Sequence, residues 1–243
     1  MKIGVIGAGR LGICFALLAE SAGHDVYVSD VRSSYVAQIN AREIFSNEPD
    51  VEELLMESKH LRATTNNQDV IKSSDVIFTF VPTPSLDDGS YDCSLVDSVV
   101  CDLLRAPNLE GKKFIVGCTT NPGFVDKVDE KLEGRGISVF YSPEFVAQGT
   151  IIRDMKNADM ILCGGRDEEG FELIKEIYLS FMDSQVNFYP MSNTAAEITK
   201  IGINCFLTYK ISYANMMGQI LYNSGCGDEI KNILASIGAD SRI

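Results

Sequence analysis

The residues best suited to hold a ligand come first, where three glycines follow a short apolar run. Residues 7–12 read GAGRLG, a G-x-G-x-x-G spacing between a run rich in Ile and Val and a segment of helical periodicity. In such a loop Gly7 permits a tight turn, Gly9 lets the backbone approach a pyrophosphate, and Gly12 lets helix and strand pack closely. The loop predicts a dinucleotide-binding site, against the alternative of a glycine-rich turn without ligand. The expected cofactor contacts on this loop are Gly7, Gly9, Arg10, Leu11 and Gly12.

An acidic residue ends the second apolar run. Asp30 stands 18 residues after Gly12, where a carboxylate can accept hydrogen bonds from ribose hydroxyls. The same carboxylate would repel a 2′-phosphate, so we expect NAD and not NADP. Arg32 lies two residues further on and makes this a preference only.

Three polar loops each follow an apolar, strand-like run. They are residues 81–84 (VPTP), 118–123 (CTTNPG) and 141–150 (YSPEFVAQGT). Loops at the carboxyl ends of parallel strands meet at one edge of the sheet, where ligands bind. Each loop taken singly could equally be a turn fixed by proline.

A lysine and an asparagine interrupt a long apolar segment. Lys200 and Asn204 stand four residues apart, hence on one face of a helix. Together they could donate hydrogen bonds to a developing alkoxide or oxyanion. The alternative is a lysine whose stem crosses apolar surface beside a core asparagine.

The elements that must position these residues alternate along the chain. Continuous apolar strands separated by helices indicate a parallel sheet covered on both faces. We expect strands over residues 2–7, 25–29, 75–81, 113–118, 137–141 and 160–163. We expect helices over residues 13–21, 35–41, 51–58, 95–104 and 124–132.

The pattern changes near residue 190. Residues 192–223 hold no strong helix breaker except two glycines and are apolar on most faces, which predicts a helix buried between layers or subunits. A helix over residues 228–236 follows. The predicted fold is α/β, a doubly wound parallel sheet of the Rossmann type followed by a long central helix and a small helical segment. We expect a dinucleotide-binding domain at 1–190 and a dimerisation region at 191–243.

Composition and net charge limit the classes of partner that the chain is expected to bind. The 243 residues are 45% hydrophobic and 23% charged, with 34 acidic against 21 basic residues and a net charge of −13. Such a surface repels phosphate backbones and anionic lipid, so we expect neither nucleic acid nor membrane as a partner. The most apolar stretch, residues 201–221, contains Lys210 and is too polar for a membrane span.

The cysteines and histidines show no metal or disulfide pattern. There are seven cysteines without a C-x-x-C pair, and two histidines. An odd number of cysteines scattered along the chain favours free thiols in a reducing, cytoplasmic compartment. We expect no metal site. An apolar run starts at residue 2, so we expect no signal peptide.

Taken in order, the motifs resemble the UDP-glucose dehydrogenase family of nucleotide-sugar 6-dehydrogenases. The series V-P-T-P, P-E-F-x-x-x-G-T and E-x-x-K-x-x-x-N is more specific than the glycine loop, and the resemblance covers essentially the whole chain. It implies oxidation of a sugar C6 hydroxyl to a carboxylate with two molecules of NAD, UDP-glucose being the default substrate. Further matching segments lie at residues 39–40 (IN), 48–49 (EP) and 238–243 (GADSRI).

The resemblance also implies roles for single residues. Thr83 and Thr119 would line the nicotinamide and catalytic pocket. Glu144 would serve acid–base chemistry or orient water. Lys200 and Asn204 would hold the oxygen that becomes negatively charged, and the long helix at 192–223 would form a homodimer interface. The implied cofactor contacts outside the glycine loop and Asp30 are Val81, Pro82, Thr83, Thr119 and Gln148.

Some positions depart from the family pattern. Gln148 stands where many members have Glu, and an amide cannot act as a base. Cys118 replaces a common serine; it is either a reactive thiol in the cleft or, as we favour, a small buried residue. Cys163 and Cys205 are expected in the core, and His24 in a surface turn.

The family's cysteine nucleophile lies in a G-F-G-G-x-C segment, and none of the seven cysteines occupies such a motif. The family's nucleotide-sugar-binding domain is missing as well. We therefore expect a fragment, inactive alone; a naturally short chain would do less than the full oxidation. Two alternatives stay open: a 3-hydroxyacid dehydrogenase, which shares the helix lysine and asparagine, and a non-catalytic NAD-binding module that dimerises.

Overall fold

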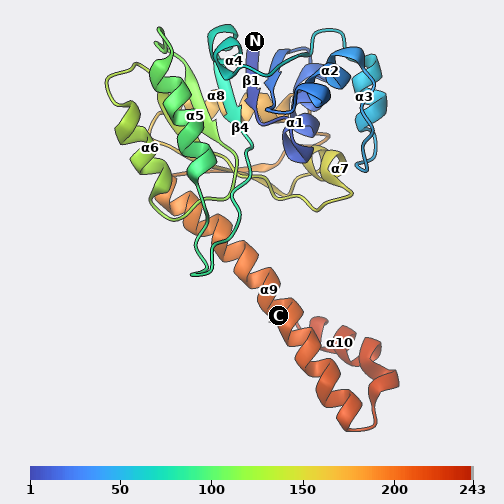
Figure 1. Cartoon of the computed structure of the whole chain (residues 1–243). Helices are drawn as coiled ribbons and strands as arrows, with labels where there is room; N and C mark the ends of the chain where they lie inside the picture. Colours follow the sequence, from blue (N-terminus) through green and yellow to red (C-terminus); the bar gives the residue numbers. More distant parts are fainter. Residues whose placement is uncertain (242–243) are drawn as a thin grey trace. The chain divides into compact units, whose positions relative to one another are not determined.

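The computed structural model describes residues 1–241; Arg242 and Ile243, part of the family-like closing segment, lie outside the described residues. The chain divides into two compact units, Met1–Ile198 and Thr199–Ile243, and each is described by itself. The first unit carries one sheet of eight strands (Figure 1). The strands are β1 (Lys2–Ile6), β2 (Asp25–Ser29), β3 (Arg62–Thr64), β4 (Val76–Thr79), β5 (Lys113–Val116), β6 (Ser138–Tyr141), β7 (Met160–Gly164) and β8 (Asn187–Met191).

The strand order is β3-β2-β1-β4-β5-β6-β7-β8. All pairings from β3 to β6 are parallel, as the continuous apolar strands predicted. The chain reverses at the join of β6 and β7, which pair antiparallel through Tyr141 and Gly164, and β8 then runs parallel to β7. The order switches direction between β1 and β4, and ligands bind in such sheets at a switch point of this kind.

Helices cover both faces of this sheet, because alternate strand residues point to opposite sides. In β4, Val76 and Phe78 belong to an apolar cluster that includes residues of α1, α3, α7 and α8, whereas Ile77 belongs to one that includes residues of α4, α5 and α6. The two apolar clusters are thus the two layers of a doubly wound fold, as predicted. The helices of this unit are α1 (Arg10–Ser21), α2 (Ser33–Ala41), α3 (Val51–Glu57), α4 (Asn67–Ser73), α5 (Ser94–Arg105), α6 (Phe124–Leu132), α7 (Ile151–Lys156) and α8 (Glu168–Leu179).

Two edge strands escaped the sequence analysis for physical reasons. Strand β3 has three residues, too few to show a periodicity. Strand β8 contains Pro190, which demotes a run to an edge position, and β8 is the outer strand of this sheet. Neither strand carries a predicted site residue.

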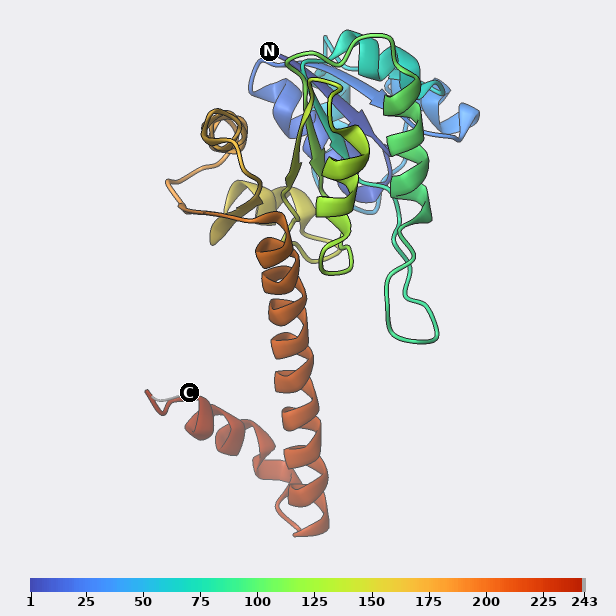
Figure 2. The same cartoon turned by 90° about the vertical axis from the view of Figure 1, so that its left-hand side faces the viewer.

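The second unit is helical. Helix α9 (Asn193–Asn223), which begins in the first unit, makes up most of it, as predicted, and a 3-10 helix (Gly227–Glu229) and α10 (Ile230–Gly238) follow. In Figure 2, α10 lies beside the distal turns of α9, and Ile230 sits against Gly218. Cys163 is buried in β7 as expected, but Cys205 is exposed on α9, so its assignment to the core is wrong for this chain. No helix within residues 1–241 is long and apolar enough to cross a membrane.

Candidate functional site

The glycine loop lies between β1 and α1 at the switch point of the sheet. Gly7 has φ +94°, and a Cβ added there would come within 2.9 Å of the Phe80 carbonyl oxygen. A Cβ at Gly12 would overlap the Gly7 carbonyl oxygen. At Gly9, by contrast, nothing lies within 4 Å of an added Cβ, so this backbone faces open space at the start of α1. That is the side from which an anion can reach the helix N-terminus.

A cavity of about 550 Å³ opens in front of this loop. Its volume lies within the range of small-molecule and cofactor sites. Its walls combine the glycine loop, the ends of β2 and β4, and α5, with exposed apolar Val31 and Leu95 at the rim. The lining residues that the sequence singled out are Gly7, Gly9, Arg10, Asp30, Val81 and Pro82.

The acidic residue of this cavity is already paired. Arg32 donates through Nε to Asp30 Oδ1 at 2.8 Å and through Nη2 to Asp30 Oδ2 at 3.0 Å. The Asp30 side chain is 8% exposed and that of Arg32 is 55% exposed. Burial alone would raise the pKa of Asp30, but the bonds from Arg32 outweigh it and hold the pKa below its usual value. The guanidinium stands 4.2 Å from the centre of the Tyr35 ring.

The third polar loop reaches back to the glycine loop. Arg10 Nη1 donates to Gln148 Oε1 at 2.6 Å, across 138 residues of sequence. Behind them the buried Glu48 carboxylate accepts the backbone N–H of Gly149 at 2.9 Å and that of Ile151 at 3.4 Å. Arg10 Nε lies 3.8 Å from Glu48 Oε1. The loop before α3 thereby holds both the 141–150 loop and Arg10 in place.

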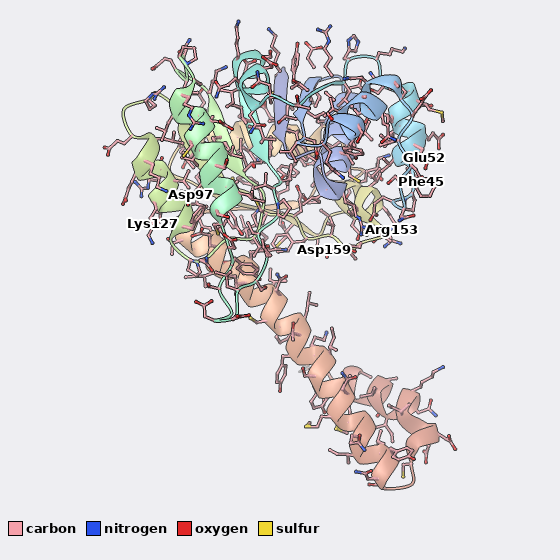
Figure 3. The ribbon with its side chains drawn as sticks, viewed as in Figure 1. Phe45, Glu52, Asp97, Lys127, Arg153 and Asp159 are labelled. Atoms are coloured by element: carbon pink, nitrogen blue, oxygen red, sulfur yellow. The ribbon has the colours of Figure 1, made fainter. Side chains whose placement is uncertain are left out.

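Glu48 joins the loop before α3 to the segment that leads into α7. Figure 3 labels one residue on each of these parts, Phe45 on the loop before α3 and Arg153 on α7. The figure shows them on the same side of the sheet, in agreement with the bonds from Gly149 and Ile151 to Glu48. The charged side chains there therefore join parts of the chain that the sequence separates widely.

The second polar loop is held by a buried carboxylate from the start of α9. Glu197 is fully buried and accepts the Thr120 hydroxyl at 2.7 Å, the Gly123 N–H at 2.6 Å and the Val125 N–H at 3.0 Å. Two of these donors are free N–H groups of the N-terminus of α6, where a carboxylate is also favoured by the helix dipole. Thr119, half-buried and next to this anchor, is positioned through the backbone.

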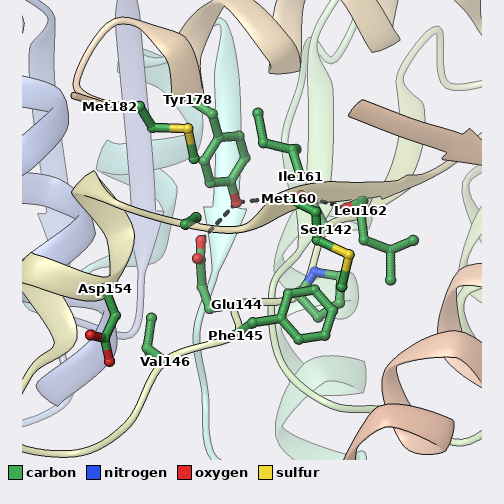
Figure 4. Close-up of a pocket in the computed structure, with 12 residues that line it drawn as sticks. Ser142, Glu144, Phe145, Val146, Asp154, Met160, Ile161, Leu162, Tyr178 and Met182 are labelled. Atoms are coloured by element: carbon green, nitrogen blue, oxygen red, sulfur yellow. Dashed lines mark hydrogen bonds between the residues drawn. The ribbon is translucent and has the colours of Figure 1, made fainter. Parts of the chain in front are cut away.

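Glu144 is bound to a tyrosine beneath the loop. Tyr178 donates to Glu144 Oε1 at 2.7 Å, and the Ser142 hydroxyl lies 3.3 Å from the Tyr178 oxygen (Figure 4). Burial, reinforced by the Glu144 carboxylate, raises the pKa of Tyr178 well above its ordinary value, so the phenol stays protonated and remains a donor. The cavity beside these residues has about 10 Å³, the room of one water molecule.

The comparisons with known proteins decide the family. Residues 1–182 match the NAD-binding domain of the UDP-glucose/GDP-mannose dehydrogenase family. The chain belongs to this family. Its cofactor is therefore NAD, and the cavity, the open backbone at Gly9 and the acid at Asp30 fit a dinucleotide.

The relatives within this family differ in the sugar that their names give. The chain is 31% identical, over its whole length, to UDP-glucose 6-dehydrogenase AglM of Haloferax volcanii, of which it covers 59%. It superposes with a TM-score of 0.89 on GDP-mannose dehydrogenase of Pseudomonas aeruginosa, at 27% identity, with 97% of the chain and 57% of that protein covered. It superposes equally, at 0.89, on UDP-D-ManNAc dehydrogenase of Pyrococcus horikoshii, at 26% identity, with 100% and 59% covered. The chain thus spans less than two thirds of these relatives.

The family's predicted site residues fall into two groups. Those on the glycine loop, on the ends of β2 and β4 and on the 141–150 loop lie in the first unit, and Val81 and Pro82 line the cavity. Thr83 and Thr119 are half-buried and are not among its lining residues. Lys200, 8% exposed, and half-buried Asn204 belong to the second unit.

The thiol beside Thr119 is not suited to a reactive role. Cys118 is buried and donates to the Thr79 carbonyl oxygen at 3.6 Å. Burial raises the pKa of Cys118 to about 12, which keeps it a thiol at neutral pH. The interpretation of Cys118 as a small buried residue fits this environment.

Three residues that the sequence analysis passed over organise the family's loops in this chain. Glu48, Tyr178 and Glu197 each hold a loop through a side-chain carboxylate or hydroxyl. Glu48 and Glu197 stood inside motifs quoted for the resemblance, so a signal was present for both. Tyr178 stood in an ordinary amphipathic helix and gave none.

Proposed function

We propose that this chain is the NAD-binding part of an NAD-dependent nucleotide-sugar 6-dehydrogenase. The observation that carries the proposal is the meeting of the glycine loop with the 141–150 loop through Arg10 and Gln148, beside a cavity of cofactor size. Catalytic and cofactor residues of a Rossmann-type enzyme converge at this edge of the sheet. UDP-glucose is the substrate that we propose first.

The residues of the cavity divide the work of holding the cofactor. The N–H groups around Gly9 and the N-terminus of α1 would take the pyrophosphate, and Asp30 the adenosine ribose. Val31 and Leu95 offer apolar contact for a base. Bound NAD supplies the hydride acceptor.

The remaining roles concern the proton and the charge that develops on oxygen. Glu144, oriented by the Tyr178 hydroxyl at 2.7 Å, would receive the hydroxyl proton through a water near Thr119. We propose that Lys200 and Asn204 stabilise the developing oxyanion. The base and the sugar of the nucleotide sugar would be read by a domain outside residues 1–243, and residues 191–243 would form the dimerisation region.

The exposed apolar side chains of α9 support a homodimer through this helix. Phe206, Tyr209, Met216 and Ile220 recur at helical spacing and are 49–65% exposed. Apolar patches of this kind mark interaction surfaces. Sedimentation of the chain at two concentrations tests the proposal: we expect a dimer that Tyr209→Glu converts to monomer, whereas a monomeric wild type would contradict it.

A reducing, cytoplasmic compartment is part of the proposal. All seven cysteines are unpaired, as expected where thiols are kept reduced.

The test of the enzymatic function uses the protein that contains this chain. NADH formation is followed with UDP-glucose, GDP-mannose or UDP-N-acetylmannosamine, and we expect two NADH per sugar oxidised for one of them. Lys200→Ala should lower kcat roughly 10²–10³-fold, the loss expected for one donor to an oxyanion, and leave NADH affinity unchanged, while Lys210→Ala on the same helix serves as control. Turnover of a 3-hydroxy acid and of no nucleotide sugar would contradict the proposal.

A further inference from the structure

The residue that should select NAD is largely occupied by a neighbouring arginine. Asp30 offers about four lone-pair positions on its two oxygens. Arg32 fills three of them: its backbone N–H donates to Oδ1 at 3.0 Å, Nε to Oδ1 at 2.8 Å, and Nη2 to Oδ2 at 3.0 Å. Only about one position is left for the two hydroxyls of a ribose.

The same pairing leaves part of the Arg32 guanidinium without an acceptor. A guanidinium carries five N–H groups, and Asp30 takes two of them. Within residues 1–241 this guanidinium has no other hydrogen-bond acceptor. Arg32 lines the cavity, and its side chain is 55% exposed. Three N–H donors therefore remain beside the Asp30 carboxylate, the group to which the proposed function assigns the adenosine ribose.

Two further features suit this corner to a phosphate. The Tyr35 ring, 4.2 Å from the guanidinium carbon, backs Arg32 and restricts its motion. Arg32 is also the N-cap of α2, so the free N–H groups of that helix start beside it, with the exposed hydroxyls of Ser33 and Ser34. The negative charge that would repel a phosphate is at the same time neutralised by the ion pair.

From this geometry we infer that the cofactor site accepts a 2′-phosphate on the adenosine ribose, bound by Arg32, and that the chain binds NADP(H) as well as NAD(H). The inference rests on the dinucleotide site of the proposed function and extends its cofactor range. Arg32 is the residue that determines this specificity, because it both neutralises Asp30 and offers the planar donors that a phosphate prefers.

Titration of the 243-residue chain with NADPH and with NADH, followed by nucleotide fluorescence, tests the inference. We expect the two dissociation constants to lie within about tenfold of one another. Arg32→Ala should weaken NADPH binding about 10- to 100-fold, the loss expected for charge-assisted hydrogen bonds. The same substitution should leave NADH binding unchanged or tighter, because Asp30 becomes free for the ribose.

Two variants complete the design. Arg105→Ala removes an equal charge from an exposed site outside the cavity and should alter neither constant. Arg32→Lys keeps the positive charge but lacks the planar, paired N–H donors of a guanidinium, so its affinity for NADPH should lie between those of Arg32→Ala and wild type.

Each remaining outcome is decisive. NADPH binding more than about tenfold weaker than NADH binding, or a similar response of both nucleotides to Arg32→Ala, overturns the inference while the NAD site stands. Binding of neither nucleotide overturns the inference and the proposed function together.

Discussion

Glu197→Ala should destabilise the first unit and loosen the loop that carries Thr119. The carboxylate is fully buried and accepts three hydrogen bonds of 2.6–3.0 Å, from Thr120, Gly123 and Val125. Alanine leaves these donors without partners in the interior. Each unsatisfied buried donor costs about 1–3 kcal/mol.

The sum is smaller than three full penalties, because burial of the carboxylate is itself unfavourable and water can enter the space left behind. We expect a loss of about 3–5 kcal/mol, in line with removal of one partner of a buried charged contact. Since about 1 kcal/mol shifts the Tm of a domain of this size by roughly 2–4 °C, the midpoint should fall by about 10 °C.

Thermal unfolding followed by circular dichroism, with urea unfolding for the free energy, measures this effect. Glu130→Ala removes an exposed carboxylate from α6 and should change little. Glu197→Gln keeps the side-chain volume and one acceptor oxygen, so its stability should lie between that of wild type and that of Glu197→Ala. Amide exchange should quicken in residues 118–125 of the alanine variant. A Tm within about 2 °C of wild type, with unchanged exchange in this loop, would refute the anchoring role of Glu197.

Three further predictions concern other parts of the first unit. Gly12→Ala should lower stability by about 3 kcal/mol in urea unfolding, since its Cβ overlaps the Gly7 carbonyl oxygen; stability equal to that of Gly202→Ala on α9 would contradict this. Cys118, with a pKa raised to about 12 by burial, should resist iodoacetamide at neutral pH while exposed Cys101 reacts, as read by peptide mass spectrometry; equal rates would count against its buried environment. Burial raises the pKa of Glu197 above its ordinary 4.5, against the bonds from Thr120, Val125 and Gly123, so the proton-linked part of its contribution to stability is fully present below that pH and is lost as pH rises through the folded pKa, while the three accepted hydrogen bonds remain. The stability of wild type relative to Glu197→Gln should therefore decrease from pH 4.5 to neutral, and an increase would show that the hydrogen bonds outweigh burial.

Most strands of the sheet and the loops that follow them could be predicted from local sequence patterns. Apolar runs with helical segments between them predicted β1, β2 and β4 to β7, and the glycine loop, Asp30 and the polar loops follow from where those strands end. The antiparallel entry of β7 was not foreseen, because an apolar run reads alike in either direction. Cys205 was assigned to the core because α9 is apolar on most faces, yet its thiol is exposed in the single chain.

The hydrogen bonds that hold the loops of the site in place could not be predicted from local sequence patterns. Glu48 binds Gly149 across 101 residues, and Glu197 binds Gly123 across 74. No periodicity or spacing rule relates such positions, although both glutamates stand in motifs of the family. The sequence shows that Arg32 is close to Asp30 along the chain. Only the structure shows that its guanidinium donates hydrogen bonds to both carboxylate oxygens of Asp30.

The central claim, that the glycine-loop cavity of this chain holds a nicotinamide dinucleotide, is tested most directly by calorimetric titration with NADH. The account predicts saturable binding of one NADH per chain, weakened at least about tenfold by Gly9→Ala, whose added methyl group would stand where the pyrophosphate approaches the backbone. Gly202→Ala on α9, which also meets nothing within 4 Å, should bind as wild type does. Absence of NADH binding to the folded chain, or equal affinity of the Gly9→Ala variant, would contradict it.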